Sequence, residues 1–310
     1  MIVENKVKKA GFVTIVGRPN VGKSTLMNTL IGHKIAITSY KPQTTRTRIR
    51  TVYTEVRGQV VFLDTPGIHK PATKLGEYMD RAAESTLKEV DLILFLAEAG
   101  SGPREADIEV MKLLARTGTP VITVITKTDA VKKAQILPVI SEYDEKWKQL
   151  AGADGAEIIP VSARTGSGID ELKNMIFDRL PEGEPFYDED TITDETERSI
   201  AEEIIREKIL RLLLDEVPHG TAVTILSMKF RDDRPLCDIN ADIICERESH
   251  KGILIGKGGA MLKKIGMAAR TDIEEMLGCK VNLKLFVKVR KDWKDNETMM
   301  KSLGYNVKDL

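Results

Sequence analysis

The fold of this chain is decided by one stretch of sequence, Gly17-Arg18-Pro19-Asn20-Val21-Gly22-Lys23-Ser24. It fits the pattern G-x-x-x-x-G-K-[ST], in which glycines let consecutive backbone N–H groups point at phosphate oxygens. The apolar run at 12–16 predicts a buried strand before it, and residues 24–31 predict a helix that stops at Gly32. This strand–loop–helix order predicts a domain that binds a nucleoside triphosphate.

Two side chains of this loop have the chemistry of a phosphate site. Lys23 is predicted to reach the β- and γ-phosphates, and the Ser24 hydroxyl is predicted to ligate Mg²⁺. The N-terminus of the following helix adds a favourable field for anions. We therefore assign nucleotide binding to the whole loop and to Thr25.

Three later apolar runs each end in a short polar motif. The motifs are Asp64-Thr65-Pro66-Gly67 after 60–63, Thr126-Lys127-Thr128-Asp129 after 121–125, and Ser162-Ala163-Arg164 after 158–161. A carboxylate at a strand end can join a Mg²⁺ shell, so we predict Asp64 as a ligand and the Gly67 N–H as a γ-phosphate donor. Each motif alone is a weak indication of a nucleotide site, but the three motifs in this order, each at the end of an apolar strand, are a specific one.

The second and third of these motifs predict which base is bound. Asp129 can accept hydrogen bonds from N1–H and the 2-amino group of guanine, whereas adenine would leave a buried Asp unpaired. The stem of Lys127 is predicted to lie on the base plane, and the Ala163 N–H to donate to guanine O6. The nucleotide-binding residues predicted from the motifs are Asp64, Thr65, Pro66, Gly67, Thr126, Lys127, Asp129, Ser162, Ala163 and Arg164.

With these motifs the chain resembles the Ras-like GTPases of the translation-factor class. The resemblance implies GTP hydrolysis with Lys23, Thr45, Asp64 and Gly67 as the catalytic residues, and with Mg²⁺ held by Ser24, Thr45 and Asp64. Thr45 lies in the candidate first switch, Lys-Pro-Gln-Thr-Thr-Arg at 41–46, and is favoured over Thr44 because related switches end Thr-Arg. The basic stretch 41–50 fits a solvated loop as well as a switch that faces RNA or an effector.

The chain departs from these GTPases at two positions. The family usually has Asn where this chain has Thr126, and that Asn braces the phosphate loop more than it reads the base. We therefore expect GTP specificity to survive and leave the nucleotide affinity open. Ras-type enzymes place Gln after the second-switch glycine to orient the attacking water, and Ile68 has no polar group to do so.

Ile68 links the chain to the GTPases that carry a hydrophobic residue at this position. The resemblance implies slow intrinsic hydrolysis and a site that a partner or a monovalent cation completes. Asn20 is the type of residue with which this subclass helps to hold potassium, so K⁺ is predicted as an activating cation. The neighbouring His69 is interpreted as a surface residue rather than a general base.

Composition sets outer limits on the function. The 310 residues suffice for two domains, and the balance of 47 basic and 47 acidic residues predicts no polyanion partner from global charge. Cys237, Cys245 and Cys279 lack metal-site or disulfide spacing, and the first two fall on the apolar phase of a predicted strand. Neither a signal-peptide-like opening nor an apolar run of about 18 residues is present, so a soluble cytoplasmic protein is expected.

A change of composition predicts a domain boundary near 181–194. This stretch combines Pro and Gly with six acids, as linkers do. We expect a GTPase domain at 1–180, an acidic linker at 181–194, a second domain at 195–300 and a tail at 301–310, with Thr193 or Asp194 capping a new helix. The second domain is predicted to have the element order α-β-β-α-α-β. Its predicted elements include a helix at 195–215, strands at 222–230 and 236–247, a longer helix after 259, and a strand over 281–290 whose residues point alternately inward and outward.

The second domain contains Gly256-Lys257-Gly258-Gly259, which fits the G-x-x-G loop of KH domains. The pattern is weak by itself, but here it lies between helical turns, after an α-β-β start and before a final strand. Residues 251–270 and 280–291 each carry five basic residues and no acid. The alternative is a helix cap with ordinary surface lysines. The predicted RNA-binding residues are Ile255, Gly256, Lys257, Gly258, Gly259, Lys263, Lys264, Lys284, Phe286, Lys288 and Arg290.

A GTPase domain followed by a KH domain resembles the family of bacterial Era GTPases, over nearly the whole chain. The resemblance rests on Asp-Thr-Pro-Gly-Ile-His-Lys-Pro at 64–71, the 41–46 switch and Ile-Gly-Lys-Gly-Gly at 255–259. It implies an α/β fold, with a Ras-like P-loop domain (a mostly parallel sheet with helices on both faces) and a C-terminal α+β type II KH domain. The implied function is a switch that binds GTP and GDP and small-subunit ribosomal RNA near its 3′ end, and that assists assembly of the small ribosomal subunit.

Other expectations accompany this resemblance. The family implies peripheral contact with the inner face of the cell membrane, although the sequence has no anchoring helix of clear form. A monomer is expected, since no dimer interface is evident. Two other classes of function fit the motifs: a constitutive RNA-binding module whose nucleotide only stabilises the fold, and an RNA-modifying enzyme that uses GTP for conformational work. No cofactor fingerprint or nucleophile–base set in the sequence favours the last.

Overall fold

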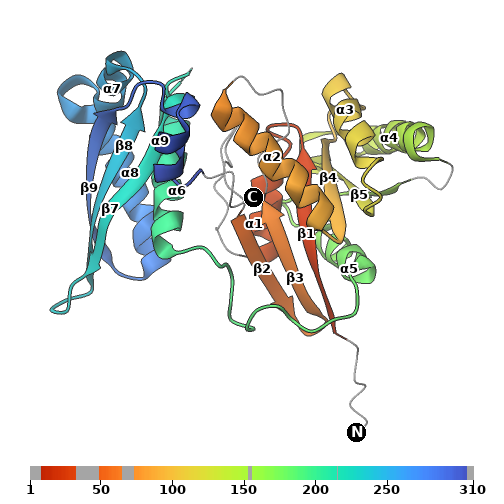
Figure 1. Cartoon of the computed structure of the whole chain (residues 1–310). Coiled ribbons are helices and arrows are strands. Elements are labelled where there is room, and N and C mark those ends of the chain that lie inside the picture. Colours follow the sequence, from red (N-terminus) through yellow and green to blue (C-terminus); the bar gives the residue numbers. More distant parts are fainter. Residues whose placement is uncertain (1–7, 33–48, 65–72, 153–155, 215, 306–310) are drawn as a thin grey trace, which may run out of the picture. The chain divides into compact units, whose positions relative to one another are not determined.

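The computed structural model describes residues 8–32, 49–64, 73–152, 156–214 and 216–305 (Figure 1). The chain forms two compact units, and the main break between them falls between Asp194 and Glu195. Each unit has its own sheet and its own buried core. None of the helices within these ranges is both long and apolar enough to span a membrane.

The first unit is built on a six-stranded sheet in the order β2-β3-β1-β4-β5-β6. β2 is antiparallel to β3, and the remaining neighbours are parallel, so the prediction of a mostly parallel sheet is confirmed. The strands are β1 (Lys9–Gly17), β2 (Ile49–Glu55), β3 (Gly58–Asp64), β4 (Leu92–Glu98), β5 (Val121–Thr126) and β6 (Glu157–Pro160).

Helices cover both faces of this sheet because both faces of its central strands are apolar. One buried cluster joins the sheet to α1 and α5 through Leu26, Met27 and Leu172, and the other joins it to α3 and α4 through Met111 and Tyr143. The helices are α1 (Lys23–Ile31), α2 (Lys74–Glu89), α3 (Glu105–Leu114), α4 (Ile136–Ala151) and α5 (Ile169–Arg179), with short 3₁₀ turns η1 (Thr128–Ala130) and η2 (Lys133–Gln135).

Residues 181–194, here called the connecting segment, lie along the first unit. The Ala10 N–H donates to Pro181 O (3.1 Å), and the Val52 N–H donates to Ile192 O (2.8 Å). The buried Gln59 amide oxygen accepts from the N–H groups of Phe186 and Tyr187 at 2.8 and 3.0 Å. Despite its linker-like composition, the segment is therefore bound to the sheet.

The helix after the connecting segment starts later than predicted. Its N-cap is Thr196, whose side chain accepts from the Ser199 N–H at 3.1 Å, so the prediction of Thr193 or Asp194 is wrong. Both residues have other partners on β2: the Thr193 hydroxyl donates to Arg50 O (2.7 Å), and the Asp194 carboxylate accepts from the Arg50 guanidinium (3.1 Å).

The second unit has the predicted α-β-β-α-α-β order. Its sheet runs β7-β8-β9, with β7 antiparallel and β9 parallel to β8. Helices α6 and α8 cover one face through a cluster that includes Ile205, Ile265 and Ile273, and Cys237 and Cys245 are buried in it as predicted. The elements are α6 (Glu197–Leu212), η3 (Pro218–Gly220), β7 (Ala222–Phe230), β8 (Leu236–Cys245), α7 (Glu248–Ile255), η4 (Lys257–Gly259), α8 (Ala260–Leu277), β9 (Lys280–Val289), η5 (Trp293–Asp295) and α9 (Glu297–Ser302).

The stretch expected as a C-terminal tail starts inside α9. Tyr305, which follows this helix, is buried and stacks on the fully buried Trp293, with 6.0 Å between the ring centroids. The Trp293 indole N–H in turn donates to Gly220 O at 3.0 Å. The chain is thus anchored in the second unit up to Tyr305.

Candidate functional site

The phosphate loop leaves the sheet at the end of β1 and enters α1. Because β1 lies between β3 and β4, the loop sits at the point where the strand order reverses, which is where open α/β sheets bind ligands. A Cβ on Gly17 would lie 2.5 Å from Leu96 O, so only glycine fits there. Asn20 and Gly22 have positive φ angles of 67° and 102°, which curl the loop.

Lys23 holds its ammonium group over the start of this loop. Its Nζ donates to the carbonyls of Gly17 and Arg18, each at 2.9 Å. Ser24 follows in the first turn of α1, and the described part of this helix start carries no acidic side chain. The loop therefore presents a cation and a helix N-terminus at one point, as a phosphate site requires.

Thr126 braces the phosphate loop from the end of β5. Its hydroxyl lies 2.6 Å from Val21 O and 3.0 Å from Ala97 O, and the residue is buried. Because the hydroxyl has a single hydrogen, it donates to one of these carbonyls at a time, and the shorter contact favours Val21. Thr126 thus makes the connection to the loop that the resemblance to Ras-like GTPases led us to expect from Asn.

The motifs at 126–129 and 162–164 meet at the carboxyl ends of β5 and β6. The Ser162 hydroxyl donates to the Asp129 carboxylate at 2.6 Å, and Arg164 lies 3.6 Å from the same carboxylate. The hydrogen bond from Ser162 is the main cause that lowers the pKa of Asp129. Asp129 is therefore held as an anion, the form that accepts two hydrogen bonds from guanine.

Two residues that sequence reasoning missed contact the residues predicted to bind the guanine base. The Thr29 hydroxyl of α1 lies 2.9 Å from Thr25 O of its own helix and 3.3 Å from Ala163 O, so its contact with the motif at 162–164 is the weaker of the two. Glu98, the last residue of β4, pairs with the Lys127 ammonium at 2.8 Å. The position of Glu98 at a carboxyl strand end was the available signal, since the other motif residues share it.

The remaining predicted residues of the nucleotide site are described in part. Asp64 is the last residue of β3 and pairs in register with Ile15 of β1, which brings its backbone to the same edge of the sheet. Within the described ranges no group of His, Cys, Asp or Glu forms a metal site by itself. The following predicted residues lie outside the described ranges: Thr45, Thr65, Pro66, Gly67, Ile68 and His69.

The glycine loop of the second unit connects α7 to α8. Gly256, Gly258 and Gly259 have φ angles of 72°, 60° and 81°, and Lys257 between them is exposed. A Cβ on Gly256 would lie 2.8 Å from the Met261 Cβ, whereas one on Gly258 would meet nothing within 4 Å. The loop therefore offers open backbone beside a lysine.

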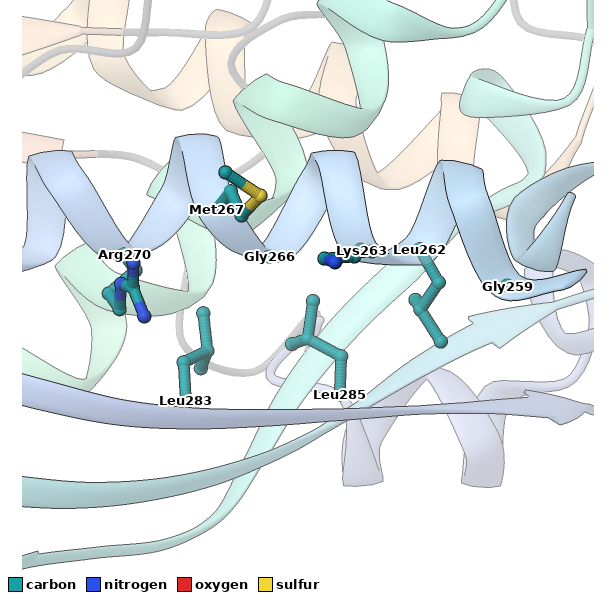
Figure 2. A pocket seen from close by; sticks show the side chains of 8 residues that line it. All are labelled: Gly259, Leu262, Lys263, Gly266, Met267, Arg270, Leu283 and Leu285. Atoms are coloured by element: carbon teal, nitrogen blue, oxygen red, sulfur yellow. The ribbon is translucent and has the colours of Figure 1, made fainter.

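A groove of about 430 Å³ starts at this loop and runs between α8 and β9. Figure 2 shows Leu283 and Leu285 rising from β9 toward α8, with Leu262 reaching from the helix toward the strand. Cationic side chains of α8 flank this apolar floor. The lining residues are Gly259, Leu262, Lys263, Gly266, Met267, Arg270, Leu283 and Leu285.

Some predicted RNA-binding residues lie at the groove and others do not. Gly259 and Lys263 line it, and Ile255 ends α7 just before the loop. Lys264 is exposed on α8 but is not part of the lining, and Arg290 follows the end of β9. Lys284, Phe286 and Lys288 alternate along β9 with the groove-lining Leu283 and Leu285, so they belong to the other face of the strand.

The groove also contains residues that sequence reasoning assigned to the core or left out. Leu262, Leu283 and Leu285 fit the spacing of apolar core residues on their helix or strand. They are only partly buried in the structure, at the edge of the sheet face that the helices cover, and there they line the groove. Lining residues on α8 recur four apart, as Leu262 and Gly266, Lys263 and Met267, then Gly266 and Arg270. This spacing puts them on one side of the helix and was the signal in the sequence.

Comparison with known proteins matches both units. A family model described as a 50S ribosome-binding GTPase matches residues 12–127, and a KH domain model matches residues 216–294. The GTPase Era of Ruminiclostridium cellulolyticum is 51% identical over 96% of this chain and 97% of its own length. That of Geobacter metallireducens is 50% identical over 96% of this chain and 98% of its own length.

Two solved structures are similar over nearly the full length. The Era protein of Aquifex aeolicus, as a variant bound to GDP·AlF4⁻, has 43% identity and a TM-score of 0.90, with 96% of this chain and 99% of that chain covered. An Era structure in complex with MgGDPNP and nucleotides 1506–1542 of 16S ribosomal RNA has 43% identity, a TM-score of 0.91 and the same coverage.

Proposed function

Since this chain belongs to the Era family of GTPases, we propose that it is a GTP-driven switch that binds small-subunit ribosomal RNA near its 3′ end during assembly of the small subunit. One observation carries the RNA part of the proposal. It is the groove between α8 and β9, which starts at the glycine loop and combines an apolar floor with cationic flanks. The similar Era structure was solved with 16S ribosomal RNA.

The groove suits single-stranded RNA because it offers a surface to each part of a nucleotide. Leu262, Leu283 and Leu285 provide apolar contact for unpaired bases, while Lys263 and Arg270 face the phosphates. Open backbone at Gly258 lets the RNA chain come close. Lys284, Phe286 and Lys288 would serve only RNA that also reaches the other face of β9.

The nucleotide site has the residues to hold GTP and the metal that accompanies it. We propose Ser24, Thr45 and Asp64 as ligands of Mg²⁺, since an Era structure contains MgGDPNP. The metal supplies positive charge to the phosphates, and Lys23 adds its ammonium from the loop. We propose in addition that K⁺ binds near Asn20, which is exposed and has a left-handed backbone. Equal turnover in potassium and sodium buffers would contradict the K⁺ part.

We propose that the connecting segment couples the nucleotide to the second unit. β2 begins at Ile49, three positions after the end of the predicted first switch at 41–46, and Arg50 binds the connecting segment twice. Its guanidinium pairs with Asp194 at 3.1 Å, and its carbonyl accepts from Thr193 at 2.7 Å. The N-cap of α6, Thr196, is two residues away. Ordering of the switch by GTP would therefore act through β2 on the start of the second unit.

We also propose the domain limits expected from the sequence at 1–180 for the GTPase domain, at 181–194 for the connecting segment and from 195 for the KH domain, but we extend the KH domain beyond the expected limit of 300 as far as Tyr305. A monomer in the cytoplasm fits a factor that acts on the small ribosomal subunit. Peripheral membrane contact, implied by the resemblance, would depend on surface residues, since no described helix has the form of a membrane span.

The decisive experiment measures binding of the full chain to RNA matching nucleotides 1506–1542 of 16S ribosomal RNA, with GDPNP or GDP bound. Gly258→Asp is expected to abolish binding, because it adds a carboxylate to the loop that must meet phosphates. Gly278→Asp is the matched control: Gly278 has a φ of 64°, also has open space around it, and lies at the far end of α8. If both variants bind RNA equally well, the groove is not the RNA site.

A further inference from the structure

A buried carboxylate, Asp107, contacts the phosphate loop through Arg18. Asp107 lies in the first turn of α3 and is completely buried. It accepts from Arg18 Nε at 2.6 Å, from the Arg104 N–H at 3.0 Å and from the Tyr143 hydroxyl at 3.2 Å. Three donors compensate the cost of burying this charge.

The donors come from different parts of the fold, so Asp107 connects them. Tyr143 belongs to α4 and is fully buried beside Phe95, with ring centroids 6.2 Å apart. Burial and the neighbouring Asp107 charge raise the pKa of Tyr143, which keeps its hydroxyl protonated as a donor. Asp107 therefore links the phosphate loop, through Arg18, to the packed core formed by α3 and α4.

Arg18 is the residue through which this link reaches the reacting groups. Its side chain pairs with Asp107, while its own carbonyl accepts from the Lys23 ammonium at 2.9 Å. Anchoring the side chain restricts the backbone of the same residue, and hence the carbonyl that holds Lys23.

We propose that Asp107 is a positioning residue for GTP binding and hydrolysis: it fixes Arg18, and through Arg18 it sets the place of the Lys23 ammonium. Tyr143 assists by fixing the carboxylate. The proposal concerns the GTPase reaction of this chain and does not depend on its RNA partner. Asp107 lies outside the GTPase motifs of the sequence.

The test compares Asp107→Asn, which removes the charge at nearly constant shape, with Tyr143→Phe, which removes one donor and keeps the ring. For the full chain, Asp107→Asn is expected to raise the Kd for GTP about tenfold, and Tyr143→Phe about threefold. Asp91→Asn is the matched control, because Asp91 accepts from the Phe12 N–H at 2.7 Å, in the half of β1 that lies away from the phosphate loop. It is expected to change the Kd less than about twofold.

If the role of Asp107 is purely structural, the effect of its substitution on the Kd and kcat does not depend on Arg18. A variant that lacks the Arg18 guanidinium therefore separates this role from the proposed one. In an Arg18→Met background, Asp107→Asn is expected to change the Kd and kcat far less than in the parent, because the connection is already broken. An undiminished effect in that background would overturn the proposal. Equal shifts in the Asp107 and Asp91 variants would overturn it as well. If Asp107→Asn fails to fold, Tyr143→Phe with unchanged GTP affinity gives the same refutation.

Discussion

Replacing Thr126 with Val tests how this chain holds its phosphate loop without the usual Asn. The change keeps the shape of a buried side chain and removes the hydroxyl that lies 2.6 Å from Val21 O. In a planar peptide the C=O of Val21 and the N–H of Gly22 point in opposite directions. Fixing the carbonyl toward Thr126 therefore fixes the Gly22 N–H on the other side of the peptide, where we expect it to meet a bound phosphate.

The size of the effect follows from the two carbonyls at this hydroxyl. Loss of a buried hydrogen bond costs about 1–3 kcal/mol when the partner stays unsatisfied. Of the two carbonyls, only that of Val21 belongs to the phosphate loop, since Ala97, whose carbonyl lies at 3.0 Å, belongs to β4. We therefore expect about 1–2 kcal/mol to appear in nucleotide binding, which is a roughly 5- to 30-fold rise in Kd.

The assay is titration of the full chain with a fluorescent GDP analogue, alongside urea unfolding without nucleotide. Thr123→Val is the matched control, because Thr123 is equally buried on β5 and its hydroxyl oxygen accepts from the Trp147 indole at 2.8 Å, away from the loop. It should lose stability but keep its nucleotide affinity. Thr126→Asn, with two amide donors for two carbonyls, should bind at least as tightly as the parent. An unchanged Kd in Thr126→Val would refute the reasoning.

Two further predictions concern the KH domain. Hydrogen bonds from Arg231 and Asn282 lower the pKa of Asp238 to about 2 from its ordinary 3.8, so its stabilising effect is complete above the ordinary value and is lost as the pH falls toward 2. Asp238→Asn should therefore lower the Tm near neutral pH, with a gap to the parent that closes on acidification; a gap independent of pH would contradict this. Arg270→Gln should weaken RNA binding and reduce the magnitude of the slope of the log binding constant against log salt concentration by about 1. An unchanged slope would show that Arg270 does not contact phosphate.

The placement of the described motifs at one edge of the sheet was predictable because the motifs are local and share one geometric rule. β1, β3 and β5 read as continuous apolar runs, and the polar residues that follow them meet because parallel strands end at the same edge of the sheet. β4 is equally apolar, but no recognised motif follows it, and its end residue Glu98 was missed. The hydrogen bond from Thr126 to the phosphate loop could not be predicted either. Only the distances in the folded structure show that this hydroxyl takes the role expected of an Asn side chain.

Features that depend on long-range pairing were harder to predict. The composition of the connecting segment is that of a linker, yet Gln59, more than a hundred positions away, binds Phe186 and Tyr187. No local pattern records such a contact. The groove was missed for a related reason. The alternation of inward and outward residues along β9 predicts its two faces, but it does not predict how far α8 covers Leu283 and Leu285.

The connecting segment also has a consequence for how this protein avoids aggregation. β2 is an edge strand of the six-stranded sheet, and such edges pair readily with other chains unless something covers them. Here Thr193 forms an antiparallel bridge with Thr51, and Ile192 accepts from the Val52 N–H at 2.8 Å. A fragment cut at residue 180 would leave this edge bare and prone to self-association, whereas one that ends at Asp194 would keep it capped.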